Sequence, residues 1–248
     1  MKIIAPKAML ARLWMVLALT GIVSGLLIGY RVIGRQSVTV SAGRQSFSTV
    51  VIDPGHGGFD GGASAQDGTL EKTINLQIAL AVRDCLDAMG VRTVMTRTQD
   101  SGTNDADVSG LHEKKVSDLK NRLALMHKEQ NRIFVSIHQN HFSQAEYYGT
   151  QVFYSGNHPD SKVLAECIRA CVVTDLQPEN RRESKRSGAE IYLLHQAKVP
   201  AVMVECGFLS NAAETAKLKS EPYQKQLAFL IALGILDYLQ AEEQQNGF

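Results

Sequence analysis

The chain is 248 residues long, which is enough for one or two domains. Hydrophobic residues make up 44% of it, so the chain can bury a substantial core. Its 26 basic and 25 acidic residues nearly cancel, which gives no indication of a nucleic-acid or other polyanionic partner.

The amino-terminal region contains an uncharged run at residues 13–30, between Arg12 and Arg31. A membrane-spanning helix needs about 20 apolar residues, so this run is just long enough. We expect residues 1–12 to stay in the cytoplasm and the run to act as an uncleaved signal-anchor that exports the rest of the chain. The alternative is export after cleavage of a signal peptide near Gly43, because a cleavage-like Val-Ser-Ala triplet precedes that residue.

From residue 48 onward, strand-like and helix-like patterns alternate. Apolar runs predict strands at residues 49–52, 91–96, 133–137, 150–154, 191–194 and 201–204. Helical periodicity predicts helices at residues 69–89, 118–128, 159–176 and 223–239, and a short helix that opens at Asn211. We interpret Thr69 as the cap of the first helix, Gly90 as its stop signal, and residues 98–116 as a loop.

This alternation is typical of a single α/β domain with a mostly parallel sheet and helices on both faces. The sequence therefore divides into five expected parts. They are a cytoplasmic amino terminus (1–12), a membrane anchor (13–30), a polar linker (31–47), the α/β domain (48–241) and a carboxyl-terminal tail (242–248).

The stretch from Val50 to Gly58 reads Val-Val-Ile-Asp-Pro-Gly-His-Gly-Gly, which predicts a buried strand ending in a glycine-rich loop. Such a loop projects His56 from the carboxyl end of the strand. Glycine tolerates positive φ and lets the backbone approach a ligand closely. A neutral imidazole held in this way suits a metal ion such as zinc, and a surface histidine on a turn is the alternative.

Three more titratable residues occupy similar positions. His138 follows the predicted strand 133–137, Glu205 follows the strand 201–204, and Glu71 lies at the start of the first helix. Ligands of open α/β sheets collect at the carboxyl ends of the strands. Two histidines and one glutamate make a zinc site with an open fourth position, and a second glutamate can serve as a general base. Taken singly, each residue also has an ordinary structural explanation, such as a helix-dipole contact for Glu71.

Seven motifs follow one another over residues 48–240. They are Val51–Gly58, Asp60–Ala63, Leu70–Lys72, Met95–Asp100, Leu119–Arg122, Ser136–Asn140 and Pro200–Asn211. Together they resemble the motifs of the zinc-dependent N-acetylmuramoyl-L-alanine amidases. The resemblance implies zinc on His56, Glu71 and His138, with Glu205 as the catalytic carboxylate. It also implies hydrolysis, outside the cytoplasm, of the peptidoglycan amide that joins the lactyl group of N-acetylmuramic acid to L-alanine of the stem peptide.

Within that family, a single anchor without an added wall-binding repeat is similar to the germination-specific amidases of the spore cortex. Those enzymes trim stem peptides so that muramic lactam can form. Vegetative wall remodelling or cell separation is the alternative inside the family. A zinc exopeptidase acting on wall peptides and a non-catalytic wall-binding protein are alternatives outside it. The sequence leaves open whether a protein partner activates the enzyme.

Candidate substrate contacts are Asn140, Arg181, Lys185 and Arg186. The three basic residues belong to the segment 181–186, which can bind stem-peptide carboxylates or simply be a solvated loop. The sequence alone does not choose between the two.

Two further residues lie next to the predicted site. His141 departs from the family pattern, which usually has a small residue there. It can crowd the metal, support one of its ligands or face solvent, and we expect it to face solvent. Cys206 follows Glu205 and could supply a thiolate ligand, but strand alternation predicts that its thiol points away from that carboxylate. None of the four cysteines lies in a CxxC pair, which argues against a zinc–thiolate cage.

Overall fold

The computed structural model describes residues 49–129 and 131–245. The expected membrane anchor and linker, residues 13–30 and 31–47, lie outside this described part. Within it, no helix combines the length and the apolar character needed to cross a bilayer.

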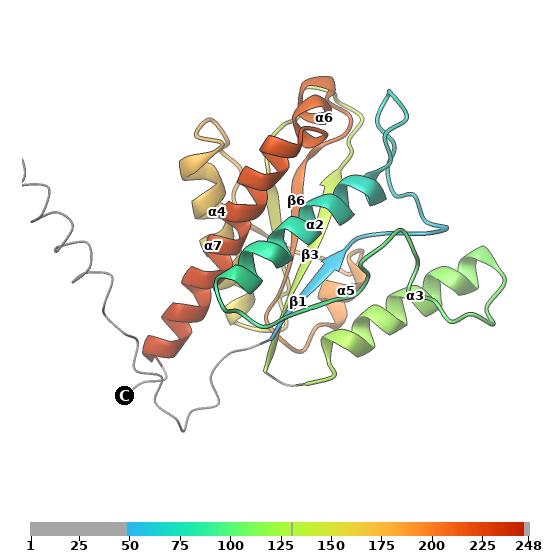
Figure 1. The fold of residues 1–248 in the computed structure, drawn as a ribbon, viewed down its shortest axis with the longest axis horizontal. Coiled ribbons are helices and arrows are strands. Elements are labelled where there is room, and N and C mark those ends of the chain that lie inside the picture. Colours follow the sequence, from blue (N-terminus) through green and yellow to red (C-terminus); the bar gives the residue numbers. More distant parts are fainter. Residues whose placement is uncertain (1–48, 130, 246–248) are drawn as a thin grey trace, which may run out of the picture. The chain divides into compact units, whose positions relative to one another are not determined.

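A six-stranded sheet runs through the centre of the described chain in the order β2-β1-β3-β6-β4-β5 (Figure 1). The strands are β1 (Thr49–Pro54), β2 (Thr93–Met95), β3 (Arg132–Asn140), β4 (Gln151–Tyr154), β5 (Lys185–Arg186) and β6 (Ala201–Phe208). Strands β2, β1, β3 and β6 are parallel, and β4 runs antiparallel to β6. The carboxyl ends of β1, β3 and β6 therefore meet at one edge of the sheet.

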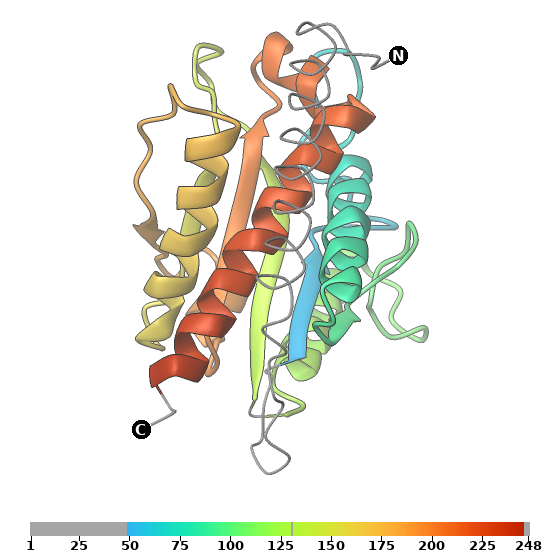
Figure 2. The ribbon, with the colours of Figure 1, turned by 60° about the vertical axis from the view of Figure 1, so that its left-hand side comes forward.

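Helices cover both faces of this sheet. They are α2 (Glu71–Ala88), α3 (Leu111–Met126), α4 (Asp160–Asp175), α5 (Tyr192–Gln196), α6 (Ala212–Leu218) and α7 (Glu221–Gln245). Figure 2 shows α2, α7 and α4 side by side across one face, where α7 packs against both of its neighbours. Helices α3 and α5 contact each other on the opposite face. The expected α/β fold with a mostly parallel sheet is confirmed.

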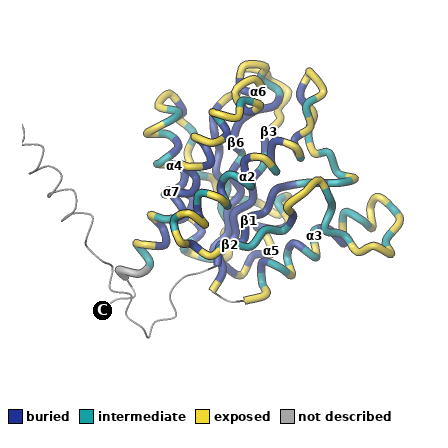
Figure 3. The backbone as a smooth tube through the Cα atoms, in the orientation of Figure 1, coloured by how far each residue is buried: buried dark blue, intermediate teal, exposed yellow. Residues whose placement is uncertain are grey.

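The core has two layers because alternate strand residues point to opposite faces of a sheet. Val50 and Ile52 of β1 pack in the larger apolar cluster, together with α2, α4 and α7. Val51 packs in the smaller cluster, together with residues of α3 and α5. All six residues of β1 are buried, as the dark blue centre of Figure 3 illustrates. This double burial explains the continuous apolar run in its sequence.

The segment Ile191–Leu194 was expected to be a strand, and this prediction is wrong. Residues Tyr192–Gln196 form the short helix α5, which buries Leu193 and Leu194 in the smaller cluster. The edge of β4 that such a strand would occupy is already paired with Lys185 and Arg186. That two-residue strand was not predicted, because its exposed polar residues carry no apolar signal.

Two helix starts also differ from the expectation. Helix α3 begins at Leu111 and not at Asp118. The sequence did not indicate the first two turns because they are mostly exposed and lack an apolar stripe. Thr69 does not cap α2, which starts at Glu71 without a side-chain cap. The backbone N–H groups of Glu71 and Lys72 donate instead to the carbonyls of Ala63 and Gly61, at 2.9 and 3.2 Å. The loop before α2 thus satisfies donors that a cap would otherwise serve.

Candidate metal centre and active site

The four residues singled out in the sequence come from adjacent elements. His56 follows β1, while His138 and Glu205 lie in β3 and β6, where they are register partners. Strand β3 lies between β1 and β6, and Glu71 is the first residue of α2. The fold therefore brings all four residues to the carboxyl-end edge of the sheet, where ligands of open α/β folds bind.

Three of these side chains form a compact cluster. Glu71 Oε2 lies 3.1 Å from His56 Nε2, and Glu71 Oε1 lies 2.9 Å from His138 Nδ1. One donor atom from each residue falls within 4.8 Å of the other two, so the group can hold a metal ion. Two imidazoles and one carboxylate are the donor set of a catalytic metal site with an open fourth position.

Two buried arginines fix the loop that carries His56. Arg97 donates to the carbonyls of Pro54 and Gly55, each at 2.9 Å. Arg122 donates to the carbonyl of His56 at 2.7 Å and forms a buried ion pair with Asp53 at 2.5 Å. His56 itself has φ of 59°, a conformation that non-glycine residues rarely adopt. These contacts hold the strained residue in position at a functional edge.

Asp60 orients the His56 ring. Its Oδ2 atom lies 2.9 Å from His56 Nδ1 and also pairs with Lys115. Burial disfavours a charged imidazole, but the carboxylates of Asp60 and Glu71 outweigh it and raise the pKa of His56 to about 9. A metal cation competes with that proton for the same nitrogen, and the same negative groups attract it. Sequence reasoning did not single out Asp60, although it opens the motif Asp60–Ala63.

The Glu71 carboxylate is held from several sides. Its oxygens accept hydrogen bonds from the backbone N–H groups of Ala63 at 2.8 Å and Gln139 at 3.1 Å, and from the Asn75 side chain at 3.1 Å. Burial raises the pKa of Glu71, but His138 and His56 have the larger, opposite effect and hold this pKa well below its usual range. The group is therefore ionised and fixed, as a metal ligand has to be.

Close packing explains one glycine of the loop. Gly62 has φ of +68°, and a Cβ there would lie 2.5 Å from Glu71 Oε2 and 2.7 Å from the His56 ring. Any side chain at this position would therefore strain the backbone and push the two groups apart.

Glu205 stands beside the cluster in a different environment. Its Oε2 atom is shielded from solvent and has no hydrogen-bond partner among the described residues. Burial, and next the negative charge of Glu71, raise the pKa of Glu205 to about 8. A buried polar atom without a partner is costly in a folded protein, so this oxygen is a candidate for contact with a water molecule or the substrate.

The remaining predicted residues fall outside the cluster. His141 is exposed, and Cys206 is buried in the larger apolar cluster, as expected for both. Lys185 and Arg186 form the exposed edge strand β5, and Arg181 donates to the carbonyl of Pro178 within its own loop at 2.5 Å. Among the described residues, no hydrogen bond or ion pair joins these three basic side chains to the histidines.

Asn140 is nearer to the cluster. It ends β3, and its backbone carbonyl accepts a hydrogen bond from Leu209 at 2.8 Å.

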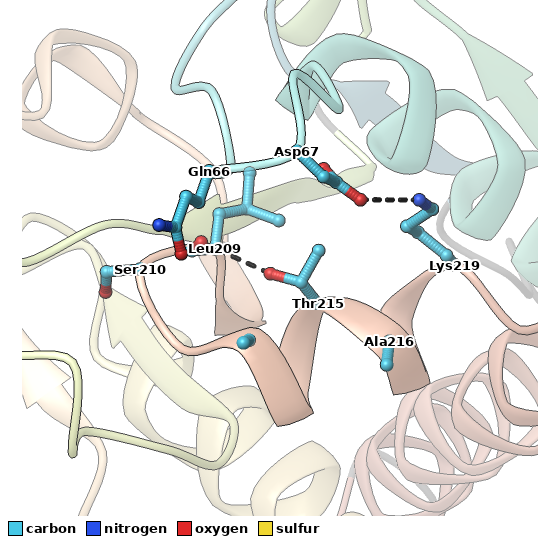
Figure 4. A pocket seen from close by; sticks show the side chains of 8 residues that line it. Gln66, Asp67, Leu209, Ser210, Thr215, Ala216 and Lys219 are labelled. Atoms are coloured by element: carbon cyan, nitrogen blue, oxygen red, sulfur yellow. Dashed lines mark hydrogen bonds and ion pairs between the residues drawn. The ribbon is translucent and has the colours of Figure 1, made fainter.

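A cavity of about 530 Å³ lies between the loop before α2 and the segment that leads into α6 (Figure 4). Its lining includes Leu209 and Ser210, and the ion pair of Asp67 with Lys219, at 2.6 Å, closes one side. Neither the three clustered residues nor Glu205 line it.

Comparison with known proteins identifies a family for the part of the chain that contains these motifs. Residues 50–237 match the family described as N-acetylmuramoyl-L-alanine amidase. The chain belongs to this family. It is accordingly an N-acetylmuramoyl-L-alanine amidase that acts on peptidoglycan, and the family resemblance noted in the sequence is confirmed.

Several relatives are similar over most of their length. A germination-specific N-acetylmuramoyl-L-alanine amidase of Bacillus subtilis is 34% identical over 189 residues, which cover 76% of this chain and 78% of that protein. A solved CwlD amidase of Clostridioides difficile, in complex with the GerS lipoprotein, is 39% identical with a TM-score of 0.75. The match covers 78% of this chain and 99% of that one. The amidase AmiC2 of Nostoc punctiforme is 32% identical with a TM-score of 0.62, over 78% and 97% of the two chains.

Proposed function

We propose that this amidase is a zinc enzyme in which His56, Glu71 and His138 bind the metal and Glu205 is the catalytic base. The observation that carries the proposal is the cluster of donor atoms within 4.8 Å, with the buried, unpartnered Oε2 atom of Glu205 beside it. A His-His-Glu donor set suits zinc, and the Asp60 carboxylate supports it by fixing the ring of His56.

The chemistry divides between the metal and the chain. When bound, zinc supplies a Lewis acid that polarises the scissile carbonyl and acidifies a water molecule. Glu205 accepts the proton of the attacking water at Oε2 and then delivers it to the leaving amine of L-alanine. Burial beside the Glu71 carboxylate raises the pKa of Glu205 to about 8, so its protonated form can deliver the proton near neutral pH. A bound metal cation would lower that pKa and favour the ionised form that accepts the proton. An amide has a poor leaving group, so this proton delivery is needed.

The reaction is tested by mass spectrometry of muropeptides. The full chain is incubated with peptidoglycan before and after chelation, and then with zinc restored. We expect free stem peptides that begin with L-alanine, together with peptide-free muramic acid, only when zinc is present. Release of single amino acids would instead favour a zinc exopeptidase.

We also propose that the substrate in the cell is spore-cortex peptidoglycan. Support comes from the Bacillus subtilis relative, which is named as germination-specific and is 34% identical to this chain. Deletion of the gene is expected to remove muramic lactam from the cortex and leave vegetative cells normal. Chains of unseparated cells with an unchanged cortex would favour the vegetative alternative.

Location and partner complete the proposal. We expect the domain to lie outside the cytoplasm, held by residues 13–30, because peptidoglycan is outside. Protease added to intact protoplasts should then digest the domain, and a mature protein that starts near Gly43 would instead indicate cleavage.

The Clostridioides difficile relative was solved in complex with a lipoprotein. We propose that an extracytoplasmic protein partner also binds this chain, which co-purification from sporulating cells would test.

A further inference from the structure

Arg182 has surroundings unlike those of the other basic residues in segment 181–186. Its guanidinium carbon lies 4.6 Å from the ring centroid of Phe208 and 5.4 Å from that of Tyr147. Its Nε atom donates to the carbonyl of Tyr148 at 2.9 Å. Two aromatic faces and one hydrogen bond therefore hold the guanidinium in a single orientation. The sequence pointed to the segment 181–186 as a whole for carboxylate binding and singled out Arg181, Lys185 and Arg186, but not Arg182.

The outer part of this guanidinium remains available. Among the described residues, no hydrogen bond or ion pair engages the two terminal nitrogens of Arg182, whereas those of Arg97 and Arg122 are bound to carbonyls and carboxylates. Arg182 is half-buried, so a ligand can reach it. A planar guanidinium with two free terminal groups matches the two oxygens of a carboxylate.

Two strand pairings place Arg182 near the proposed catalytic carboxylate of Glu205. Phe208 pairs with Asn140 of β3, two residues beyond His138, the register partner of Glu205, which is roughly 7 Å along the sheet. Gln151 is the register partner of Glu205 in β4, and its side-chain amide donates to the carbonyl of Glu183 at 2.5 Å. The segment that carries Arg182 therefore runs beside the active edge of the sheet.

The substrate of an N-acetylmuramoyl-L-alanine amidase carries a free carboxylate close to the scissile bond. The residue that follows L-alanine in the stem peptide bears a free carboxylate, and an extended peptide advances about 3.5 Å per residue. This carboxylate therefore lies within two residue lengths of the scissile amide, which is at most roughly 7 Å. We propose that Arg182 is a specificity-determining residue that binds this stem-peptide carboxylate. The inference rests on the proposed role of Glu205 at the scissile bond.

Two muropeptide substrates that differ in one group test the inference. One carries the free carboxylate after L-alanine, and the other carries a carboxamide of the same size. We expect wild-type kcat/KM to be roughly 10- to 100-fold higher for the acid, as a charge-assisted hydrogen bond implies. Arg182→Gln should lose that preference by lowering kcat/KM for the acid alone. Arg182→Lys should keep only part of it, and Arg169→Gln, which removes a surface ion pair of α4, should behave as wild type.

Two results would overturn the inference. One is a wild-type enzyme that cleaves the acid and the amide equally well. The other is an Arg182→Gln variant that slows both substrates by the same factor, since this indicates that Arg182 only supports the aromatic loop. If wild type cleaves neither substrate, the proposed function fails. Calorimetric binding of both ligands to the Glu205→Gln protein then decides the inference separately, because equal affinities would refute it.

Discussion

Glu205 and His138 are register partners on the adjacent parallel strands β6 and β3. The register is regular from Phe134 and Ala201 up to this pair, and it shifts only beyond His138. Because side chains opposite each other in paired strands project to the same face, the sheet itself fixes the spacing of these two groups. Paired strands of the core, and not a flexible loop, therefore set the distance between the proposed metal ligand and the proposed base.

The first prediction concerns Asp60, which orients the ring of His56. Asp60→Asn removes the charge that holds this ring, so zinc affinity should fall by about 10- to 100-fold, as is usual when a residue supporting a metal ligand is lost. Competition with a chelator measures the affinity. Asp67→Asn is the matched control, because Asp67 lies in the same loop but pairs with the distant Lys219. Equal affinities of the two variants would contradict the role of Asp60.

The second prediction compares two glycines of the loop before α2. Both have positive φ, but a Cβ at Gly62 would meet Glu71 and His56, whereas a Cβ at Gly68 has nothing within 4 Å. Gly62→Ala should therefore abolish stoichiometric zinc binding, while Gly68→Ala should retain it. Both variants should show the modest destabilisation expected from an alanine at positive φ. Elemental analysis of the purified proteins gives the zinc content, and a fully loaded Gly62→Ala protein would show that packing around Glu71 is not limiting.

The third prediction concerns the buried arginine that supports the His56 loop. Arg122→Ala leaves Asp53 buried and uncompensated, which typically costs about 3–5 kcal/mol in unfolding free energy. Arg83→Ala removes a surface pair with Asp84 and should cost less than about 1 kcal/mol. Urea denaturation of both variants measures the difference. Similar midpoints would mean that the buried pair contributes no more than the exposed one.

The fourth prediction follows from the charge state of Asp53. Burial opposes its ionisation, but Arg122 and the hydroxyls of Ser136 and Thr96 outweigh it and keep the pKa of Asp53 below its usual range. A carboxyl with a lowered folded pKa stabilises the protein above about pH 4, its pKa when unfolded, and that stabilisation is lost as the pH falls further. Asp53→Asn should weaken this acid dependence of the unfolding free energy. An unchanged slope between pH 5 and pH 3, roughly the range concerned, would contradict it.

The sequence predicted the sheet and the convergence of His56, Glu71 and His138, because apolar strands and strand-end residues have strong local signals. It could not predict that Ile191–Leu194 contributes to a helix and not a strand. Strand β4 pairs instead with Lys185 and Arg186, and this pairing joins residues about 30 positions apart, which local sequence patterns do not reveal. The supporting contacts of Asp60 and the stacking of Arg182 also join residues that only tertiary packing brings together. Their roles, like those of the metal ligands, remain predictions for experiment.

The central claim is that Glu205 is the base and not a metal ligand. Glu205→Gln keeps the size of the side chain but cannot accept a proton, so the rate should fall by about 10²–10⁴-fold. The decisive measurement is the zinc content and the amidase rate of this variant, alongside Glu71→Gln. We predict a zinc-loaded, nearly inactive Glu205→Gln protein and a zinc-depleted Glu71→Gln protein. Wild-type activity in Glu205→Gln, or loss of its zinc, would contradict the account.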